Sequence, residues 1–356
     1  EQAMTAGVSA ADVDGDGDVD LFLPRVGKPN GLYLNDGSGS FTDVGVEAGV
    51  GGPDDGFGAS AGAFLDTEGD GDLDLFVTGT GQRGNALYVN DGSGSFTEES
   101  AERGLVWPAI ADTQLGSKHH GVSVADFNRD GFLDLLVLQW YSEVYHAEAF
   151  EVASAQQGWD GDYAPGSCES ADAFEAAGFP KQQGAPQSRS ALFLNNGDGT
   201  FADATERWGV PTDGVVAFTG VFADFDTDGW QDLAIAGDGC TSRLLRNVDG
   251  ERFEDVTDAS GVGTDENGMG AIARDVDGDG LVDLFVTSIS FSLEEGEECP
   301  VTGFSGCSGN RLFLNNGDFT FRDATDEFGL REGDWGWGTV VEDLDGNGSP
   351  EVVQVN

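Results

Sequence analysis

Short apolar segments recur along the chain, and each stops at an acidic, glycine-rich loop. Six of them end at an aspartate, reading GVSAAD, AGAFLD, GVSVAD, TGVFAD, GAIARD and GTVVED and ending at residues 12, 66, 126, 224, 275 and 343. A second apolar run follows each loop, such as VDLFLP at 19–24 and LDLFVT at 73–78. Runs of this length, rich in Val, Leu and Phe and bounded by glycine, predict strands and not helices.

Two further strands follow each pair except the last. In the first copy they read LYLN at 32–35 and SFTD at 40–43, and Asn-Asp-Gly between them is a hairpin-turn signal. The same segment returns from Asn85, Ser190, Ser242 and Asn310. Each unit is therefore predicted to be a four-stranded antiparallel meander, with the acidic loop between its first and second strands.

Repetition of four-stranded units predicts an all-β fold, a β-propeller of four-stranded antiparallel blades. Six repeats are visible, and the last is half complete because only its first two strands precede Asn356. We expect a single domain over residues 1–356, with loop insertions at about 140–189 and 289–309. A stacked solenoid of β-meanders is the alternative.

The acidic loops follow the pattern D-x-D-x-D-G-x-x-D, with Asp, Glu or Asn at positions one, three, five and nine and Gly at position six of all six copies. Alternate side chains of such a tight loop converge on one centre, and hard divalent cations prefer oxygen ligands. The position-seven residue adds a backbone carbonyl. We therefore expect up to six Ca²⁺ ions, held by Asp12, Asp14, Asp16, Asp18 and Asp20; Asp66, Glu68, Asp70, Asp72 and Asp74; Asp126, Asn128, Asp130, Phe132 and Asp134; Asp224, Asp226, Asp228, Trp230 and Asp232; Asp275, Asp277, Asp279, Leu281 and Asp283; and Asp343, Asp345, Asn347, Ser349 and Glu351.

The six loops differ in how closely they follow the pattern and in their predicted affinity for calcium. Asn128 and the neighbouring Arg129 predict weaker binding in the third loop, and Asn347 and Glu351 make the sixth a variant. EF-hand and dockerin-type loops share the spacing, but both are flanked by helices, whereas strands are predicted here. The remaining alternative is that the loops are acidic turns without metal.

The charge limits the classes of partner that are expected, and the cysteine content indicates the redox compartment. The 356 residues include 66 acidic and 16 basic ones, a formal net charge of −50, so neither nucleic acid nor membrane insertion is expected. The four cysteines suit two disulfides in an oxidising compartment. Cys299 and Cys307 bracket a short loop, which leaves Cys168 for Cys240; four free buried thiols are the alternative.

The alternation of the acidic loop with the NxLYxNDGxGxF segment resembles the FG-GAP/VCBS repeat proteins, a family that includes relatives of cartilage acidic protein and, more distantly, the integrin α-subunit head. The resemblance covers the chain outside the two insertions. It implies a β-propeller with calcium in the loops of one face, an extracellular or cell-surface location, and binding or adhesion without catalysis.

The connections at the other end of each meander are the predicted ligand face. The first insertion carries aromatic side chains able to hold a sugar ring or a protein partner, namely Trp140, Tyr141, Tyr145, Trp159 and Tyr163. A satellite core under the loop is the alternative. Neither a P-loop nor a His-Glu-x-x-His motif is present in the sequence, and we expect no enzyme activity.

The sequence thus predicts a secreted calcium-binding module with a protein or glycan ligand. One alternative is a structural subunit of a surface filament, self-associating through the incomplete last blade. Another is a polysaccharide lyase or hydrolase, or an accessory domain of one.

Overall fold

The computed structural model describes residues 7–25, 27–52, 58–81, 84–105, 117–141, 190–211, 215–290 and 308–356, with the backbone alone at 80–81, 117–120 and 141. These residues belong to two compact units, and each is described by itself. Unit 1 comprises Glu1–Glu143 and Arg189–Thr205, and unit 2 comprises Val144–Ser188 and Glu206–Asn356. The single domain expected over residues 1–356 stays a prediction.

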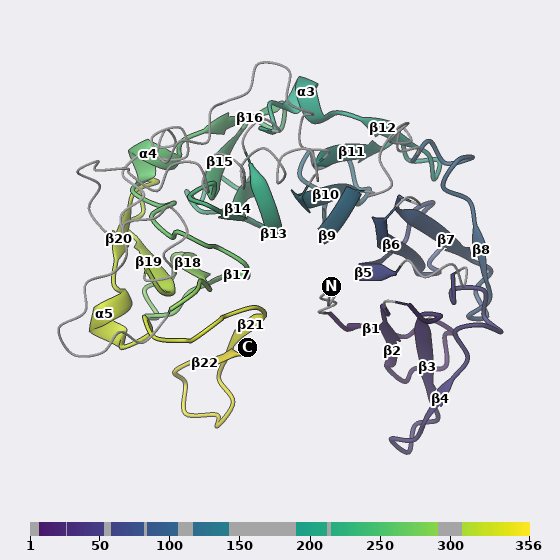
Figure 1. Cartoon of the computed structure of the whole chain (residues 1–356). Helices are drawn as coiled ribbons and strands as arrows, with labels where there is room; N and C mark the ends of the chain where they lie inside the picture. The colour runs from purple at the N-terminus through teal and green to yellow at the C-terminus, as the bar shows by residue number, and fades with distance from the viewer. Residues whose placement is uncertain are drawn as a thin grey trace, which may run out of the picture. The chain divides into compact units, whose positions relative to one another are not determined.

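Unit 1 holds three antiparallel meanders, which we call blades 1 to 3 (Figure 1). Blade 1 contains β1 (Ser9–Ala11), β2 (Asp20–Leu23), β3 (Gly31–Asn35) and β4 (Phe41–Asp43). Blade 2 contains β5 (Ala59–Leu65), β6 (Asp74–Gly81), β7 (Ala86–Asn90) and β8 (Phe96–Glu98). Blade 3 contains β9 (Ser117–Ala125), β10 (Asp134–Tyr141), β11 (Ala191–Asn195) and β12 (Phe201–Asp203).

Unit 2 repeats the same order of strands. Blade 4 contains β13 (Val216–Ala223), β14 (Asp232–Asp238), β15 (Arg243–Val248) and β16 (Arg252–Asp255). Blade 5 contains β17 (Ala271–Arg274), β18 (Asp283–Val286), β19 (Arg311–Asn315) and β20 (Phe321–Asp323). A sixth repeat has two strands, β21 (Thr339–Glu342) and β22 (Glu351–Gln354).

The predicted all-β meanders are confirmed, with every described pairing inside a blade antiparallel between consecutive strands. Three four-residue helices were not predicted: α3 (Thr205–Trp208), α4 (Thr257–Ser260) and α5 (Thr325–Phe328). They follow the fourth strands, and Gly261 and Gly329 end the last two in the left-handed conformation. Strands β6 and β9 also pair at Thr80 with Lys118, which joins blades 2 and 3 into one sheet.

The second strand of a blade is buried on both faces, which explains its continuous apolar sequence. In β6, Leu75 and Val77 enter the core between blades 1 and 2, whereas Phe76 enters the core between blades 2 and 3. In β18, Leu284 packs toward blade 4, and Phe285 packs toward β21 of the sixth repeat through Val341. Alternation along a strand thus sends neighbouring residues into different cores. The blades of one unit are held together by apolar layers between successive sheets.

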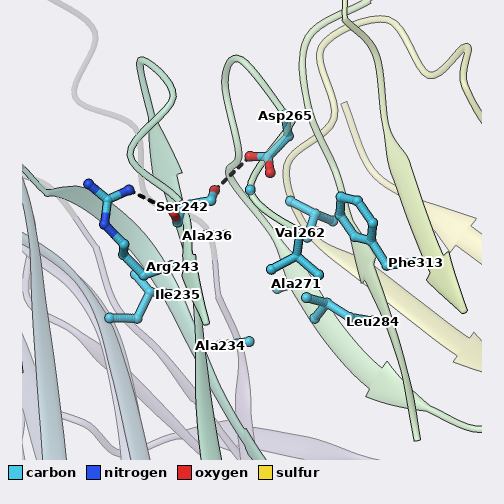
Figure 2. A pocket seen from close by; sticks show the side chains of 12 residues that line it. Ala234, Ile235, Ala236, Ser242, Arg243, Val262, Asp265, Ala271, Leu284 and Phe313 are labelled. Atoms are coloured by element: carbon cyan, nitrogen blue, oxygen red, sulfur yellow. Dashed lines mark hydrogen bonds between the residues drawn. The ribbon is translucent and has the colours of Figure 1, made fainter. Parts of the chain in front are cut away.

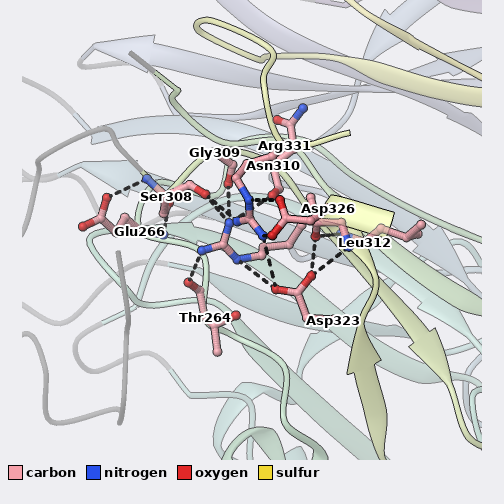
Figure 3. Close-up of polar contacts among 11 residues, drawn as sticks. Thr264, Glu266, Ser308, Gly309, Asn310, Leu312, Asp323, Asp326 and Arg331 are labelled. Carbon is pink, nitrogen blue, oxygen red and sulfur yellow. Dashed lines mark hydrogen bonds and ion pairs between the residues drawn. The ribbon is translucent and has the colours of Figure 1, made fainter. Parts of the chain in front are cut away.

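In unit 2, buried Arg311 anchors the end of blade 5 opposite its acidic loop. Its guanidinium donates to the carbonyl oxygens of Ser308, Gly309 (3.2 Å) and Asn310 (3.1 Å), and to that of Thr264 at 3.3 Å. Figure 3 shows the residues around it, including Asp323, whose Oδ2 lies 3.6 Å from Nε of Arg311. Only 4% of Arg311 is exposed, and burial lowers the pKa of its guanidinium. One side chain therefore ties the third strand to the connections on either side.

Replacing Arg311 by Met should destabilise unit 2 by about 3 kcal/mol or more, because buried carbonyls lose a donor and Asp323 loses one of its two arginine partners. Denaturant unfolding monitored by tryptophan fluorescence measures this. Arg322→Met is the matched control, since Arg322 makes an exposed ion pair with Glu327 and should cost under about 1 kcal/mol. Equal effects of the two substitutions would contradict the anchoring role.

Candidate metal centres

Each acidic loop joins the first and second strands of its repeat and closes in the same way. The position-one carboxylate accepts the N–H of the position-six glycine in all six loops, from 2.8 Å at Gly348 to 3.0 Å at Gly71 and Gly131. That glycine has φ between 90° and 95° in every copy, a conformation that a Cβ would strain. The invariant glycine of the pattern is therefore a requirement of the turn.

The position-five side chain caps the next turn of the loop. Its oxygen accepts the N–H of position seven in every copy, at 2.8–3.0 Å, for example from Asp18 to Asp16 and from Ser349 to Asn347. Carboxylate and amide oxygens can both accept this bond. The Asn347 of the sixth loop is thus compatible with the turn.

Four of the six loops bring three carboxylates together. Ligand oxygens lie within 4.8 Å of one another in the groups Asp12, Asp14 and Asp20; Asp224, Asp226 and Asp232; Asp275, Asp277 and Asp279; and Asp343, Asp345 and Glu351. Oxygens bound to one Ca²⁺ at about 2.3–2.6 Å lie at most about 5 Å apart. The spacing in these four loops suits a single calcium ion. The predicted carbonyl ligands at position seven stay a prediction.

The position-nine carboxylate is buried in blades 1 to 5 and links the loop to the hairpin beside it. In blade 2, Asp74 Oδ2 accepts the N–H of Thr67 at 3.2 Å, and Oδ1 accepts that of Asn90 at 2.8 Å. Burial raises the pKa of Asp74 to about 6, that of Asp232 to about 7 and that of Asp134 to about 8. Nearby loop carboxylates add to all three shifts. A neighbouring positive charge would favour the ionised form of these side chains.

Two arginines pair with carboxylates at positions three and five of the second and fourth loops. Arg246 Nη2 lies 2.6 Å from Asp226 Oδ2 and 3.5 Å from Asp228 Oδ2 in the fourth loop. Arg103 Nη2 lies 3.0 Å from Glu68 Oε1 in the second loop. In the described part of the chain, the second and third loops form no group of three acidic ligands at the 4.8 Å spacing. Glu68 is held by Arg103 and by the Thr67 hydroxyl, and Asn128 replaces an acid in the third loop.

The residues of the fourth loop fit a divalent cation on independent grounds. Asp224 Oδ1 is buried and has no hydrogen-bond partner within the described residues, whereas Asp12, Asp66 and Asp275 use this oxygen to accept the position-four N–H. Position four of this loop is Thr227, whose φ is 60°. An unpaired buried carboxylate oxygen beside two further carboxylates is a ligand set for a hard cation.

The sequence interpretation missed the asparagine that ends the third strand. Asn35, Asn90, Asn195, Asn247 and Asn315 each donate their backbone N–H to the position-nine aspartate of their own blade at 2.8–2.9 Å. Each Nδ2 also donates to the carbonyl of position eight, at 3.0–3.4 Å. The recurrence of Asn as the last residue of each LYLN-like run is the signal in the sequence.

The predicted ligand face is only partly covered by the described residues. Trp140 lies half-buried in β10, Tyr141 is described by its backbone alone, and Tyr145, Trp159 and Tyr163 lie outside the described residues. Cys240 is buried, while Cys168, Cys299 and Cys307 lie outside the described part, so their pairing stays a prediction. Among the described residues, no helix is long and apolar enough to cross a membrane.

Figure 2 shows a cavity in unit 2 lined by apolar side chains such as Val262, Leu284 and Phe313. At its polar end Ser242 Oγ donates to Asp265 Oδ2 at 2.7 Å. Its volume is about 10 Å³, which is room for one water molecule and not for a sugar or a peptide side chain. This cavity is a packing feature of the core between blades 4 and 5.

The repeats match known proteins over much of the chain. Human cartilage acidic protein 1 is 26% identical over 301 residues, which are 81% of this chain and 35% of that protein. The mouse protein is 25% identical over the same length and 36% of its own. The chain thus spans about a third of the length of these relatives. The V. cholerae biofilm matrix protein Bap1 aligns over 96% of this chain and 42% of its own, with a TM-score of 0.45 and 14% identity.

A model of the FG-GAP-like repeat matches five segments, at residues 12–77, 66–137, 184–235, 224–286 and 301–353. These segments contain all six acidic loops and cover more than half of the chain. The predicted family is confirmed: this chain belongs to the FG-GAP-like repeat family.

Proposed function

We propose that this chain is an extracellular calcium-binding β-propeller that binds a protein or glycan ligand and is not itself an enzyme. The single observation that carries the calcium proposal is the convergence of three carboxylates within 4.8 Å in each of four loops. Each site has several carboxylates, which favours Ca²⁺ over Mg²⁺, because Mg²⁺ keeps much of its water shell. Six ions would offset twelve of the fifty net negative charges.

The ligand would bind at the end of the blades opposite the acidic loops. In a meander, the loop between strands one and two and the turn between strands three and four lie at one end, and the remaining connections lie at the other. Both long insertions join a second strand to a third, so they belong to that other end. Long connections on a rigid scaffold are frequent binding sites. The similarity to cartilage acidic protein 1 is in keeping with an extracellular binding role.

A second candidate is a subunit of an extracellular assembly. The sixth repeat is a two-stranded sheet in which β22 pairs only with β21 among the described residues. Val340, Val353 and Val355 are 42–57% exposed there. An apolar sheet with an open edge favours pairing with another strand. Light scattering in the presence of Ca²⁺ separates this candidate, which requires oligomers, from a monomeric binding module.

Removing calcium should lower the midpoint of thermal unfolding, because an ion that binds only the folded state stabilises it by mass action. One site at a free concentration of 100 times its Kd contributes about 2.7 kcal/mol. Calorimetry with Ca²⁺, with excess chelator and after calcium is restored measures this at fixed ionic strength. Magnesium is the control and should restore little. An unchanged midpoint on chelation would mean that the loops are not metal sites.

Arg246→Gln should tighten calcium binding in the fourth loop by about two- to fivefold, because the guanidinium next to Asp226 competes with the ion. The factor corresponds to a partly exposed ion pair of under about 1 kcal/mol. Terbium luminescence excited through Trp230, which lies at position seven of this loop, reports occupancy of the site. Arg322→Gln is the matched control, with the same change of charge at an exposed pair in another blade. Weaker binding in Arg246→Gln would assign the arginine a supporting role instead.

A glycan panel and extracellular protein extracts, screened with Ca²⁺ and with chelator, test the ligand proposal. Calcium-dependent retention without conversion of the ligand is expected, and Trp159→Ala with Tyr163→Ala should weaken it. Detection of cleaved or unsaturated products would overturn the proposal that the chain is not an enzyme.

A further inference from the structure

The acidic loops of neighbouring blades are joined by a continuous series of hydrogen bonds. Its central element is the asparagine at the end of each third strand. Besides its bonds within its own blade, Asn90 donates Nδ2–H to the carbonyl of Val13 at 2.8 Å. Val13 is position two of the acidic loop in the preceding blade. Its N–H donates to the position-nine carboxylate of that loop, Asp20, at 3.0 Å.

The series extends through unit 1 with the same geometry. Asn90 donates its backbone N–H to Asp74, and Asp74 accepts the N–H of Thr67. The carbonyl of Thr67 accepts Nδ2–H of Asn195 at 2.9 Å, and Asn195 donates its backbone N–H to Asp134 at 2.9 Å. The position-nine carboxylates of blades 1, 2 and 3 are therefore connected through the backbone of two loop residues, Val13 and Thr67, and through two asparagines.

Unit 2 repeats the arrangement between blades 4 and 5. Asp232 accepts the N–H of Phe225 at 3.0 Å, and the carbonyl of Phe225 accepts Nδ2–H of Asn315 at 2.7 Å. The backbone N–H of Asn315 then donates to Asp283 at 2.9 Å. The recurrence of one set of bonds between three pairs of blades shows that the connection is a rule of the repeat.

Water cannot readily replace these bonds. Asn90, Asn195 and Asn315 are 3–6% exposed, and Val13, Thr67 and Phe225 are 0–3% exposed. Val13 and Phe225 belong to the apolar cores between the blades that their carbonyls connect. The orientation of each amide is fixed, because Oδ1 accepts the N–H of a glycine in the following turn, at 2.9 Å for Gly197 and Gly317 and 3.1 Å for Gly94. A loop cannot move its second peptide without disturbing the next blade.

We propose that Asn90, Asn195 and Asn315 couple the acidic loops of adjacent blades, so that a cation bound in one loop raises the affinity of the next. The inference rests on the proposed calcium binding. An ion in the fourth loop holds Asp232, which fixes the Phe225 peptide and, through Asn315, the carboxylate of Asp283. The fifth loop then loses less conformational freedom when it binds, which is positive coupling between sites. Coupling is reciprocal, so an ion in the fifth loop equally favours the fourth.

The test reads the fourth loop while the fifth is disabled. Terbium luminescence excited through Trp230 reports the fourth loop, and Trp230→Phe, which copies Phe132 of the third loop, verifies the origin of the signal. Asp277→Asn with Asp279→Asn disables the fifth loop and retains an oxygen for the bonds that both side chains accept. Titrations of the full chain compare the protein with an intact and with a disabled fifth loop in three backgrounds: parent, Asn315→Ser and Asn316→Ser. They are made in 0.15 M salt to screen exposed charges.

In the parent, disabling the fifth loop should weaken terbium binding in the fourth by about fivefold or more, the lower end of typical coupling between sites. In the Asn315→Ser background, the ratio of the terbium Kd with the fifth loop disabled to the Kd with it intact should fall toward one. In Asn316→Ser it should stay as in the parent, because Nδ2 of Asn316 donates to Thr320 within the exposed turn.

If disabling the fifth loop leaves the terbium affinity of the fourth loop unchanged in the parent background, the proposal is overturned. This outcome needs no asparagine variant, so the test does not depend on the folding of Asn315→Ser. An equal ratio in the parent and in Asn315→Ser would assign the effect to charge alone and would also overturn it. Failure of the calcium proposal would give a different result. In the protein with all loops intact, terbium would then produce no saturable signal that depends on Trp230 and that Ca²⁺ displaces.

Discussion

The structure depends on one buried carboxylate per blade, at position nine of the acidic loop. Asp20, Asp74 and Asp232 each accept one N–H from the loop and one from the end of the third strand. A buried carboxylate is costly unless hydrogen bonds and a positive charge compensate for its lost hydration. Burial raises the pKa values of Asp74 and Asp232 although both carboxylates accept hydrogen bonds, which indicates that these bonds compensate only in part. The same group that fixes the hairpin to the loop therefore creates the demand for a cation.

This constraint explains why the acidic pattern and the hairpin pattern alternate so regularly. The loop without the hairpin would leave Oδ1 of the aspartate unpaired, and the hairpin without the loop would leave the N–H of its asparagine unpaired. The side chain at position seven adds a steric link, because a Cβ on Gly250 would lie 2.3 Å from the Trp230 ring and one on Gly197 would lie 2.6 Å from the Phe132 ring. Loop and turn therefore form one structural element, although they are separate in sequence.

Much of this could be predicted from the sequence, because the determinants are local. The strands follow from short apolar runs, and the loops follow from a spacing in which Gly17 and its equivalents need a positive φ. The contacts between blades could not be predicted in the same way. Asn315 and Phe225 are 90 residues apart, and the hydrogen bond between them exists only after two sheets have packed. The ion pair of Arg246 with Asp226 could not be predicted either, because β15 brings Arg246 to Asp226 only when the loop lies beside the hairpin.

The two ends of a blade are under different physical demands, and this bears on where a ligand would bind. At the acidic end, hydrogen bonds within each loop and bonds such as Asn90 to Val13 constrain the loop, so an insertion there would break several interactions at once. At the other end, β10 and β11 stay paired, Leu135 with Phe193, although an insertion of about fifty residues separates them. Because paired strands already hold the ends of this insertion together, lengthening it adds little closure entropy. New recognition surfaces can therefore be built at the second end without disturbing the acidic loops at the first.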